Sequence, residues 1–227
     1  MGGGTVANSE PTPSAAEIGE FAAAAKAHLD ALVSTLSIPV PLLLGLAVAT
    51  RSVGAGVASE VSFQGVKLPL AVGSMMILAF NGLMLLHVAR LTASLSADWR
   101  HSERAKRVSY TISRHSGLLN PFFRLKPFDE FDRVLLIIPQ LSVGMLLGFH
   151  LLFILTPPDV QVVFGGYLNP VAIVVSLLHL GGNFLATFAI VGLAHAMHGW
   201  TASMLIIVGY VVGVFLSYQM MNALGVM

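Results

Sequence analysis

The sequence predicts an all-α fold, namely a polytopic membrane helix bundle with five transmembrane helices and a basic loop between the second and third. Composition is the first observation behind this prediction. The 227 residues are 56% hydrophobic and only 10% charged, whereas soluble domains carry about 25% charged residues. The second observation is that the chain after Arg133 contains no Lys or Arg and one acid, Asp159. The third is a series of apolar stretches close to the ~20 residues that cross a bilayer.

The N-terminal segment at 1–30 is expected to be disordered or interfacial, and a transmembrane domain is expected at 31–227. Residues 1–14 are small and polar and include two prolines, so they bury too little apolar surface to fold. Residues 15–30 are rich in Ala. They are interpreted either as an interfacial helix or as a helical extension of the first span.

The apolar stretches define the expected spans. Pro39 and Pro41 fall inside the first span and predict a kink near Ile38. Residues 51–67 are interpreted as a loop. Pro69 and the pair Asn169–Pro170 indicate helix starts, because Pro is favoured in the first turn and Asn at the cap. The five spans are expected at about 31–50, 69–90, 134–155, 170–193 and 201–224.

The expected loop at 91–133 fixes the orientation. Nine of the twelve Lys and Arg residues lie between Arg90 and Arg133, so the positive-inside rule places this loop in the cytoplasm. We expect an inner, cytoplasmic membrane and contact with lipid headgroups rather than with nucleic acid, since no nucleic-acid-binding framework surrounds the cluster. Phe and charged residues alternate in 120–133, which predicts rings at headgroup level. The candidate headgroup-binding residues are Arg100, Arg104, Lys106, Arg107, Arg124 and Lys126.

Polar residues within the spans are the candidate site. At 1.5 Å per residue, one layer lies roughly 10 to 15 Å from the cytoplasmic end. A deeper layer containing His150 and His179 lies at about 21 to 24 Å. Such groups must find a partner or line water, so each layer is either a set of interhelical hydrogen bonds or a functional site. The first layer consists of Asn81, Gln140, Asn183 and Tyr210.

Histidines raise two cofactor hypotheses. His150 and His179 lie on adjacent spans at similar depth, and two such histidines can be the axial ligands of a b-type haem. His195 and His198 have i,i+3 spacing, and with His87 they are candidate metal ligands at the inner edge. The sequence does not identify a cofactor. The chain has no Cys, so thiolate sites are excluded.

Glycine spacing predicts close helix packing. Gly144-x-x-x-Gly148 and Gly209-x-x-x-Gly213 each place small residues on one helix face, which lets two backbones approach. We expect these faces to meet another helix, either within the protomer or between copies.

Three functions remain compatible with the sequence. The first is a non-enzymatic packed subunit of a homo- or hetero-oligomeric membrane assembly, with a permeation path as a further option. Its partners would be the bilayer and either other membrane subunits or copies of itself. The alternative is a haem-binding anchor of an electron-transfer complex. The third is a membrane enzyme using the inner-edge histidines, although phosphate-binding loops, dinucleotide fingerprints and HExxH motifs are absent.

Overall fold

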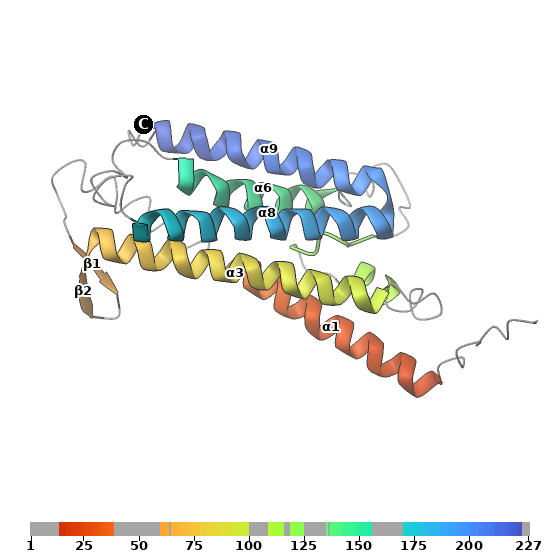
Figure 1. The fold of residues 1–227 in the computed structure, drawn as a ribbon. Coiled ribbons are helices and arrows are strands. Elements are labelled where there is room, and N and C mark those ends of the chain that lie inside the picture. The colour runs from red at the N-terminus through yellow and green to blue at the C-terminus, as the bar shows by residue number, and fades with distance from the viewer. Residues whose placement is uncertain are drawn as a thin grey trace, which may run out of the picture.

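The computed structural model is a bundle of long helices with a short β-hairpin at one end (Figure 1). The elements are α1 (Ala15–Ser37), β1 (Glu60–Phe63), β2 (Val66–Pro69), α3 (Leu70–Trp99), α6 (Ile138–Leu155), α8 (Pro170–His198) and α9 (Trp200–Ala223). The residues that the structure describes are 14–38, 60–63, 65–99, 109–115, 119–124, 135, 137–155 and 170–223.

Three helices are long and apolar enough to cross a membrane, so the predicted membrane helix bundle is confirmed at this level. The qualifying stretches are Met75–Ala97 in α3, Ile173–His198 in α8 and Trp200–Gln219 in α9. α6 contains a shorter apolar stretch, Ile138–Leu151. Of the expected first span, residues 31–37 form the end of α1, and 39–50 lie outside the described residues.

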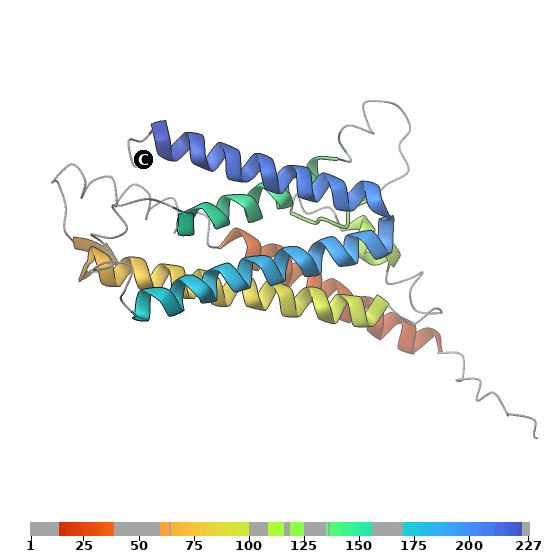
Figure 2. The ribbon, with the colours of Figure 1, turned by 45° about the horizontal axis from the view of Figure 1, so that its top comes forward.

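The four helices α3, α6, α8 and α9 are arranged as two parallel pairs (Figures 1 and 2). α3 packs along α8, and α6 packs along α9. The two pairs run in opposite directions, so helices that follow each other in sequence are antiparallel. Each close pair therefore joins helices that are separated in the chain by another helix.

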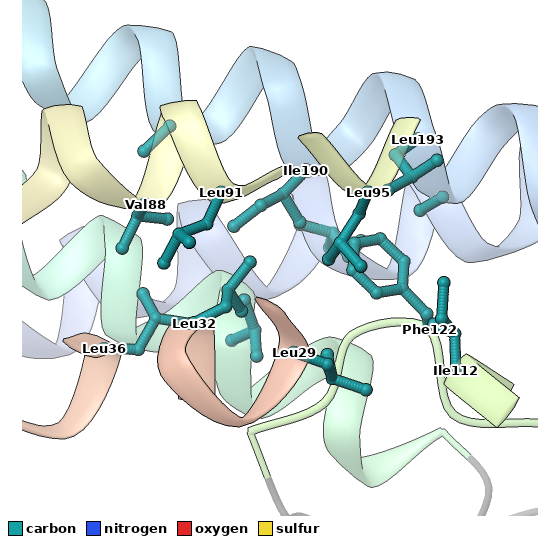
Figure 3. Packing of buried hydrophobic residues seen from close by; sticks show 14 of the residues in the cluster. Leu29, Leu32, Leu36, Val88, Leu91, Leu95, Ile112, Phe122, Ile190 and Leu193 are labelled. Atoms are coloured by element: carbon teal, nitrogen blue, oxygen red, sulfur yellow. The ribbon is translucent and has the colours of Figure 1, made fainter. Parts of the chain in front are cut away.

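α1 packs against the second half of α3 rather than standing apart from the bundle. A capping box starts α1, because the Ser14 hydroxyl accepts from the amide of Glu17 and the Glu17 carboxylate accepts from the amide of Ser14. The helix ends at Ser37, and Ile38 at its C-cap still has helical backbone angles, with φ −61° and ψ −46°. Its apolar face contributes Leu29, Leu32 and Leu36 to a buried cluster with Val88, Leu91 and Leu95 of α3 (Figure 3).

A β-hairpin occupies part of the sequence predicted to be a loop. β1 and β2 pair antiparallel, with Glu60 opposite Pro69 and Phe63 opposite Val66. Gly65 in the connection has φ 81°, a conformation that glycine adopts without steric cost. β-branched residues in both short strands favour this pairing.

The turn between α8 and α9 is tighter than the gap between the expected spans at 170–193 and 201–224. Gly199 alone separates the helices and has φ 78°, and its amide donates to the carbonyl of His195 at 2.8 Å. This is the glycine-terminated helix end that satisfies a last-turn carbonyl. The turn therefore fixes α9 antiparallel to α8.

Part of the predicted basic loop is also buried in the bundle. α3 extends to Trp99, and Ile112 and Phe122 join the apolar cluster (Figure 3). The Phe122 ring, which is predicted to lie at headgroup level, is fully buried within the protein. Asn120 holds this segment in a turn: its amide group donates to the carbonyls of Ile112 and His115, and its oxygen accepts from the amide of Phe122.

Candidate functional site

Five buried or half-buried polar side chains gather where α3, α6, α8 and α9 pack together, and we call them the polar cluster. Helices α6, α8 and α9 contain no Asp, Glu, Lys or Arg. Apart from the charged residues of α3, the cluster therefore lies among helices that have no charged side chain of these four types. Its members are Asn81, His150, His179, Asn183 and Tyr210.

His179 links three helices. Its Nε2 lies 2.7 Å from the carbonyl oxygen of His150, and its Nδ1 lies 3.0 Å from Nδ2 of Asn81. Because a carbonyl can only accept, Nε2 carries the hydrogen and donates. Nδ1 then accepts from the Asn81 amide. This fixes the tautomer of a buried imidazole between α3 and α6.

Several polar atoms next to this link have no hydrogen-bond partner among the described residues. They include both ring nitrogens of His150 and Oδ1 of Asn81. His150 is 0% exposed. A buried polar atom without a partner costs about 1–3 kcal/mol, so native proteins keep few of them and each one is a candidate for a role beyond packing.

Asn183 forms a second link one helical turn after His179. Its Nδ2 donates to the carbonyl of Leu147 at 2.8 Å, and its Oδ1 accepts from the hydroxyl of Tyr210 at 2.8 Å. α6, α8 and α9 are thus joined through one amide. These bonds satisfy both ends of the Asn183 side chain.

Glycines bring the helix backbones together at the level of the cluster. A Cβ atom at Gly209 would lie 2.5 Å from the carbonyl oxygen of Leu141, and one at Gly182 would lie 2.7 Å from that of Gly82. Added Cβ atoms at Gly144, Gly148 and Gly213 would also lie well under 3.0 Å from backbone of the facing helix. The glycines of both predicted motifs thus lie at the α6–α9 contact, each against backbone of the facing helix.

Gln140 does not join the polar cluster. It lies at the start of α6, where its Nε2 donates to the carbonyl of Phe123 at 2.9 Å. His198 bonds to the same segment, because its Nε2 donates to the carbonyl of Phe122 at 2.8 Å. The loop around Phe122 is therefore attached to both α6 and α8.

The inner-edge histidines are not brought together. His87 and His195 are exposed, and the His195 ring makes an edge contact with Trp200 at 4.8 Å between centroids. No group of three His, Cys, Asp or Glu side chains that could hold a metal ion occurs within the described ranges. His87, His195 and His198 therefore do not form the proposed metal site in this structure.

The geometry around His150 and His179 does not fit a haem. Axial ligation requires both imidazoles to point a free ring nitrogen at an iron between them. The two nitrogens of His179 instead face the His150 carbonyl and the Asn81 amide. A porphyrin ring between the two histidines would have to separate the His179 imidazole from the His150 carbonyl, which it contacts directly.

The headgroup-binding prediction falls mostly outside the described residues. Arg124 is described and exposed. Its backbone amide donates to the carbonyl of Ser113 at 2.9 Å. The positions that lie outside the described ranges are Arg100, Arg104, Lys106, Arg107 and Lys126.

A hydrogen bond between Asp30 and His115, outside the membrane-spanning segments, connects α1 to the segment after α3. Oδ1 of Asp30 lies 2.5 Å from Nε2 of His115, and Oδ2 lies 3.2 Å from Nζ of Lys26. The hydrogen bond from His115 and then that from Lys26 lower the pKa of the Asp30 carboxyl below its ordinary value of 3.8.

Two residues of the site were missed by sequence reasoning. A Cβ atom at Gly82 would lie 3.0 Å from backbone atoms of His179, and Gly182 faces Gly82. The signal was present, since each glycine adjoins an asparagine of the cluster, in Asn81–Gly82 and in Gly182–Asn183. A small residue beside a polar one lets a facing helix approach within hydrogen-bonding distance.

Comparison of the chain with protein-family models, with curated proteins and with solved structures gave no match. The class that the fold defines is therefore a helical membrane bundle with a polar cluster at its centre. Its function has to be argued from that cluster.

Proposed function

We propose that the chain is a non-enzymatic integral membrane protein, a packed subunit of a homo- or hetero-oligomeric assembly in a cytoplasmic membrane. We further propose that the polar cluster lies on a permeation path. The observation that carries this proposal is His150, which is fully buried and has no hydrogen-bond partner on either ring nitrogen among the described residues.

Energetics support a role for the cluster beyond helix association. Hydrogen bonds between membrane helices contribute only about 0.6 kcal/mol on average. Asn183 and Tyr210 fit that purpose, because their groups are paired. His150 does not fit a purely packing role. An apolar side chain at this position would fill the space and would leave no ring nitrogen unpaired. Polar residues kept at membrane depth characteristically line substrate or ion pathways.

The topology we propose has five spans, formed by residues 31–50 together with α3, α6, α8 and α9. The basic loop at 91–133 is cytoplasmic, which follows from the nine Lys and Arg residues between Arg90 and Arg133. The 18 residues of α6 extend about 27 Å, and the bilayer can thin slightly around so short a span.

The outer faces of α8 and α9 suit either lipid or neighbouring subunits. Val174, Leu177 and Phe188 of α8 and Val211 of α9 are all more than half exposed. In a membrane these side chains meet acyl chains at no cost. The same faces are the surface available to a second copy or to a larger subunit.

The experiment is purification into nanodiscs and liposomes. Mass measurement of the nanodisc complex should give more than one copy or a co-purified membrane subunit. Liposomes containing the protein should pass protons, Na⁺, K⁺ or Cl⁻ faster than empty ones, and His150→Leu should lower that flux at least about tenfold, the scale of 1.4 kcal/mol.

The lipid-facing Val212→Leu is the matched control and should leave flux unchanged. A monomer with no partner refutes the subunit part of the proposal. Flux equal to that of empty liposomes, or equal flux for His150→Leu and the parent, refutes the permeation path.

A further inference from the structure

We infer that His179 is a buried proton-binding site, and that Asn81 hydrogen-bonds both of its charge states by turning its amide group. The inference rests on the proposed permeation path and deepens it by naming the proton as the species bound there. Proton binding to His179 can be measured without measuring transport. The proton site and the permeation path can therefore each be refuted without refuting the other.

The neutral state is the one that the structure contains. His179 donates from Nε2 to the His150 carbonyl and accepts at Nδ1 from the amide of Asn81, at 2.7 Å and 3.0 Å. Both ring nitrogens are therefore used. The remaining atom of this group, Oδ1 of Asn81, is buried without a partner among the described residues.

The protonated state uses that unpaired oxygen. When Nδ1 gains a hydrogen it becomes a donor and can no longer accept from the Asn81 amide. A half-turn about the last side-chain torsion exchanges Nδ2 and Oδ1 of Asn81, which presents an acceptor to the new N–H. Nε2–H keeps its bond to His150, and the Leu78 carbonyl also interacts with the ring. The net change is one proton taken from water, with no other covalent bond made or broken.

His179 is better placed than His150 to hold the proton. A protonated His150 would have two N–H donors, and neither ring nitrogen faces a hydrogen-bond partner within the described part of the chain. A protonated His179 is surrounded by acceptors: the His150 carbonyl, the Leu78 carbonyl and Oδ1 of Asn81 after rotation. The neutral His150 ring nearby then remains the next group able to accept a proton.

No fixed charge lies beside the site in the helices packed around it. The titratable neighbours are His150 on α6 and Tyr210 on α9. Tyr210 bonds to Asn183, which lies one helical turn after His179. Helices α6, α8 and α9 contain no Asp, Glu, Lys or Arg. The charged residues of α3 are Arg90 and Asp98, which lie beyond Asn81 toward the end of the helix at Trp99. The bound proton is therefore stabilised by carbonyl and amide dipoles rather than by a carboxylate.

The test is ¹⁵N NMR of histidine-labelled protein in liposomes, titrated from about pH 8 to about pH 5. His179→Gln identifies the His179 signals among those of the eight histidines. In the parent, the His179 ring should change from one protonated nitrogen to two, while His150 keeps its neutral pattern. A folded parent in which His179 stays neutral throughout overturns the inference.

Two substitutions test the role of Asn81. Asn81→Asp places a carboxylate beside Nδ1 and should raise the proton affinity of His179 by about tenfold or more. Asn81→Leu offers no acceptor and should lower that affinity. Val212→Leu is the control with unchanged affinity. Titration of His179 that is the same in both Asn81 variants refutes the amide rotation.

Flux and titration together separate this inference from the proposed function. If His179 titrates and liposomes show no flux, the proton site stands and the permeation path fails. If ions cross and His179 remains neutral, the path stands and the proton site fails.

Discussion

The Asn183 side chain connects three helices, because its amide bonds to Leu147 of α6 and to Tyr210 of α9. Asn183→Leu removes both bonds and leaves the Tyr210 hydroxyl without its acceptor. We expect the free energy of unfolding to fall by about 1–3 kcal/mol, the cost of a buried unpaired polar group. Denaturant unfolding in bicelles measures this change.

The neighbouring Phe184 provides the control for that experiment. It is exposed on the outer face of α8, so Phe184→Leu should leave the unfolding free energy nearly unchanged. Equal stability of the Asn183→Leu variant and the parent would mean that this link contributes nothing to the fold.

Asp30 gives a pH prediction outside the membrane. Its pKa is lowered first by the hydrogen bond from His115, so the contact stabilises the fold fully above the ordinary pKa of 3.8 and loses that contribution as pH falls through the lowered value. His115→Ala should move the Asp30 pKa back toward 3.8. Carbon NMR of labelled aspartate measures it, with His28→Ala as the comparison. An Asp30 pKa that stays put would contradict the contact.

The polar residues of the site could be identified from the sequence, but their depth in the membrane, and hence their hydrogen-bond partners, could not. His150, His179, Asn81 and Asn183 stand out as polar residues in apolar stretches. Their partners depend on where each helix ends, however. The sequence places Asn81 in a shallower layer than His179, because the second span is expected to end at about residue 90. In the structure α3 continues to Trp99 and α8 to His198, so Asn81 and His179 are almost equally far from these helix ends and share a level.

At the scale of helices, the contact between α6 and α9 gives the clearest test. Gly213 faces backbone of Met145 with no room for a Cβ atom. Gly213→Leu must therefore separate the two helices, and we expect a loss of about 3 kcal/mol or more, at the upper end of the cost of overpacked cores. Val212 lies next to it and is 38% exposed, so Val212→Leu should be tolerated. Thermal unfolding in detergent compares the two variants, and equal midpoints would show that the glycines are incidental.

One helix start marked by proline was predictable, since α8 begins at Pro170 as expected. The kink predicted near Ile38 is not tested, because α1 ends at Ser37 and residues 39–50 lie outside the described ones. α6 begins at Ile138, later than the expected start at 134, because Pro139 suits a first helical turn. The start of the basic segment is interpreted from the sequence as a solvated helical continuation of the second span, and α3 does continue to Trp99. Its residues look solvated in sequence, but Leu91 and Leu95 pack against α1 and Phe122.

For the whole molecule, the arrangement of the helices predicts which loops share a side of the membrane. The end of α3 at Trp99 and the α8–α9 turn lie at the same end of the bundle (Figure 1). Ser102 follows α3 closely in the sequence, and Thr201 lies in the first turn of α9. The chain has no Cys, so single cysteines at Ser102, Thr201 and Asp159 can be labelled separately. We expect Ser102 and Thr201 to react from the cytoplasmic side and Asp159 from the opposite side. Labelling of all three from one side would contradict the topology.

The pairing of helices that are not neighbours in sequence determines the order in which the protein can be assembled during synthesis. α6 leaves the ribosome before α8 and α9 exist, so its glycine face and His150 first meet lipid or the insertion machinery. α8 then supplies His179 and Asn183, and α9 supplies Gly209 and Gly213. The native contacts of α6 are therefore complete only after the last helix, α9, has been inserted. Interrupted synthesis therefore leaves an incomplete chain that exposes polar groups to lipid, which is the kind of species that membrane quality-control proteases remove.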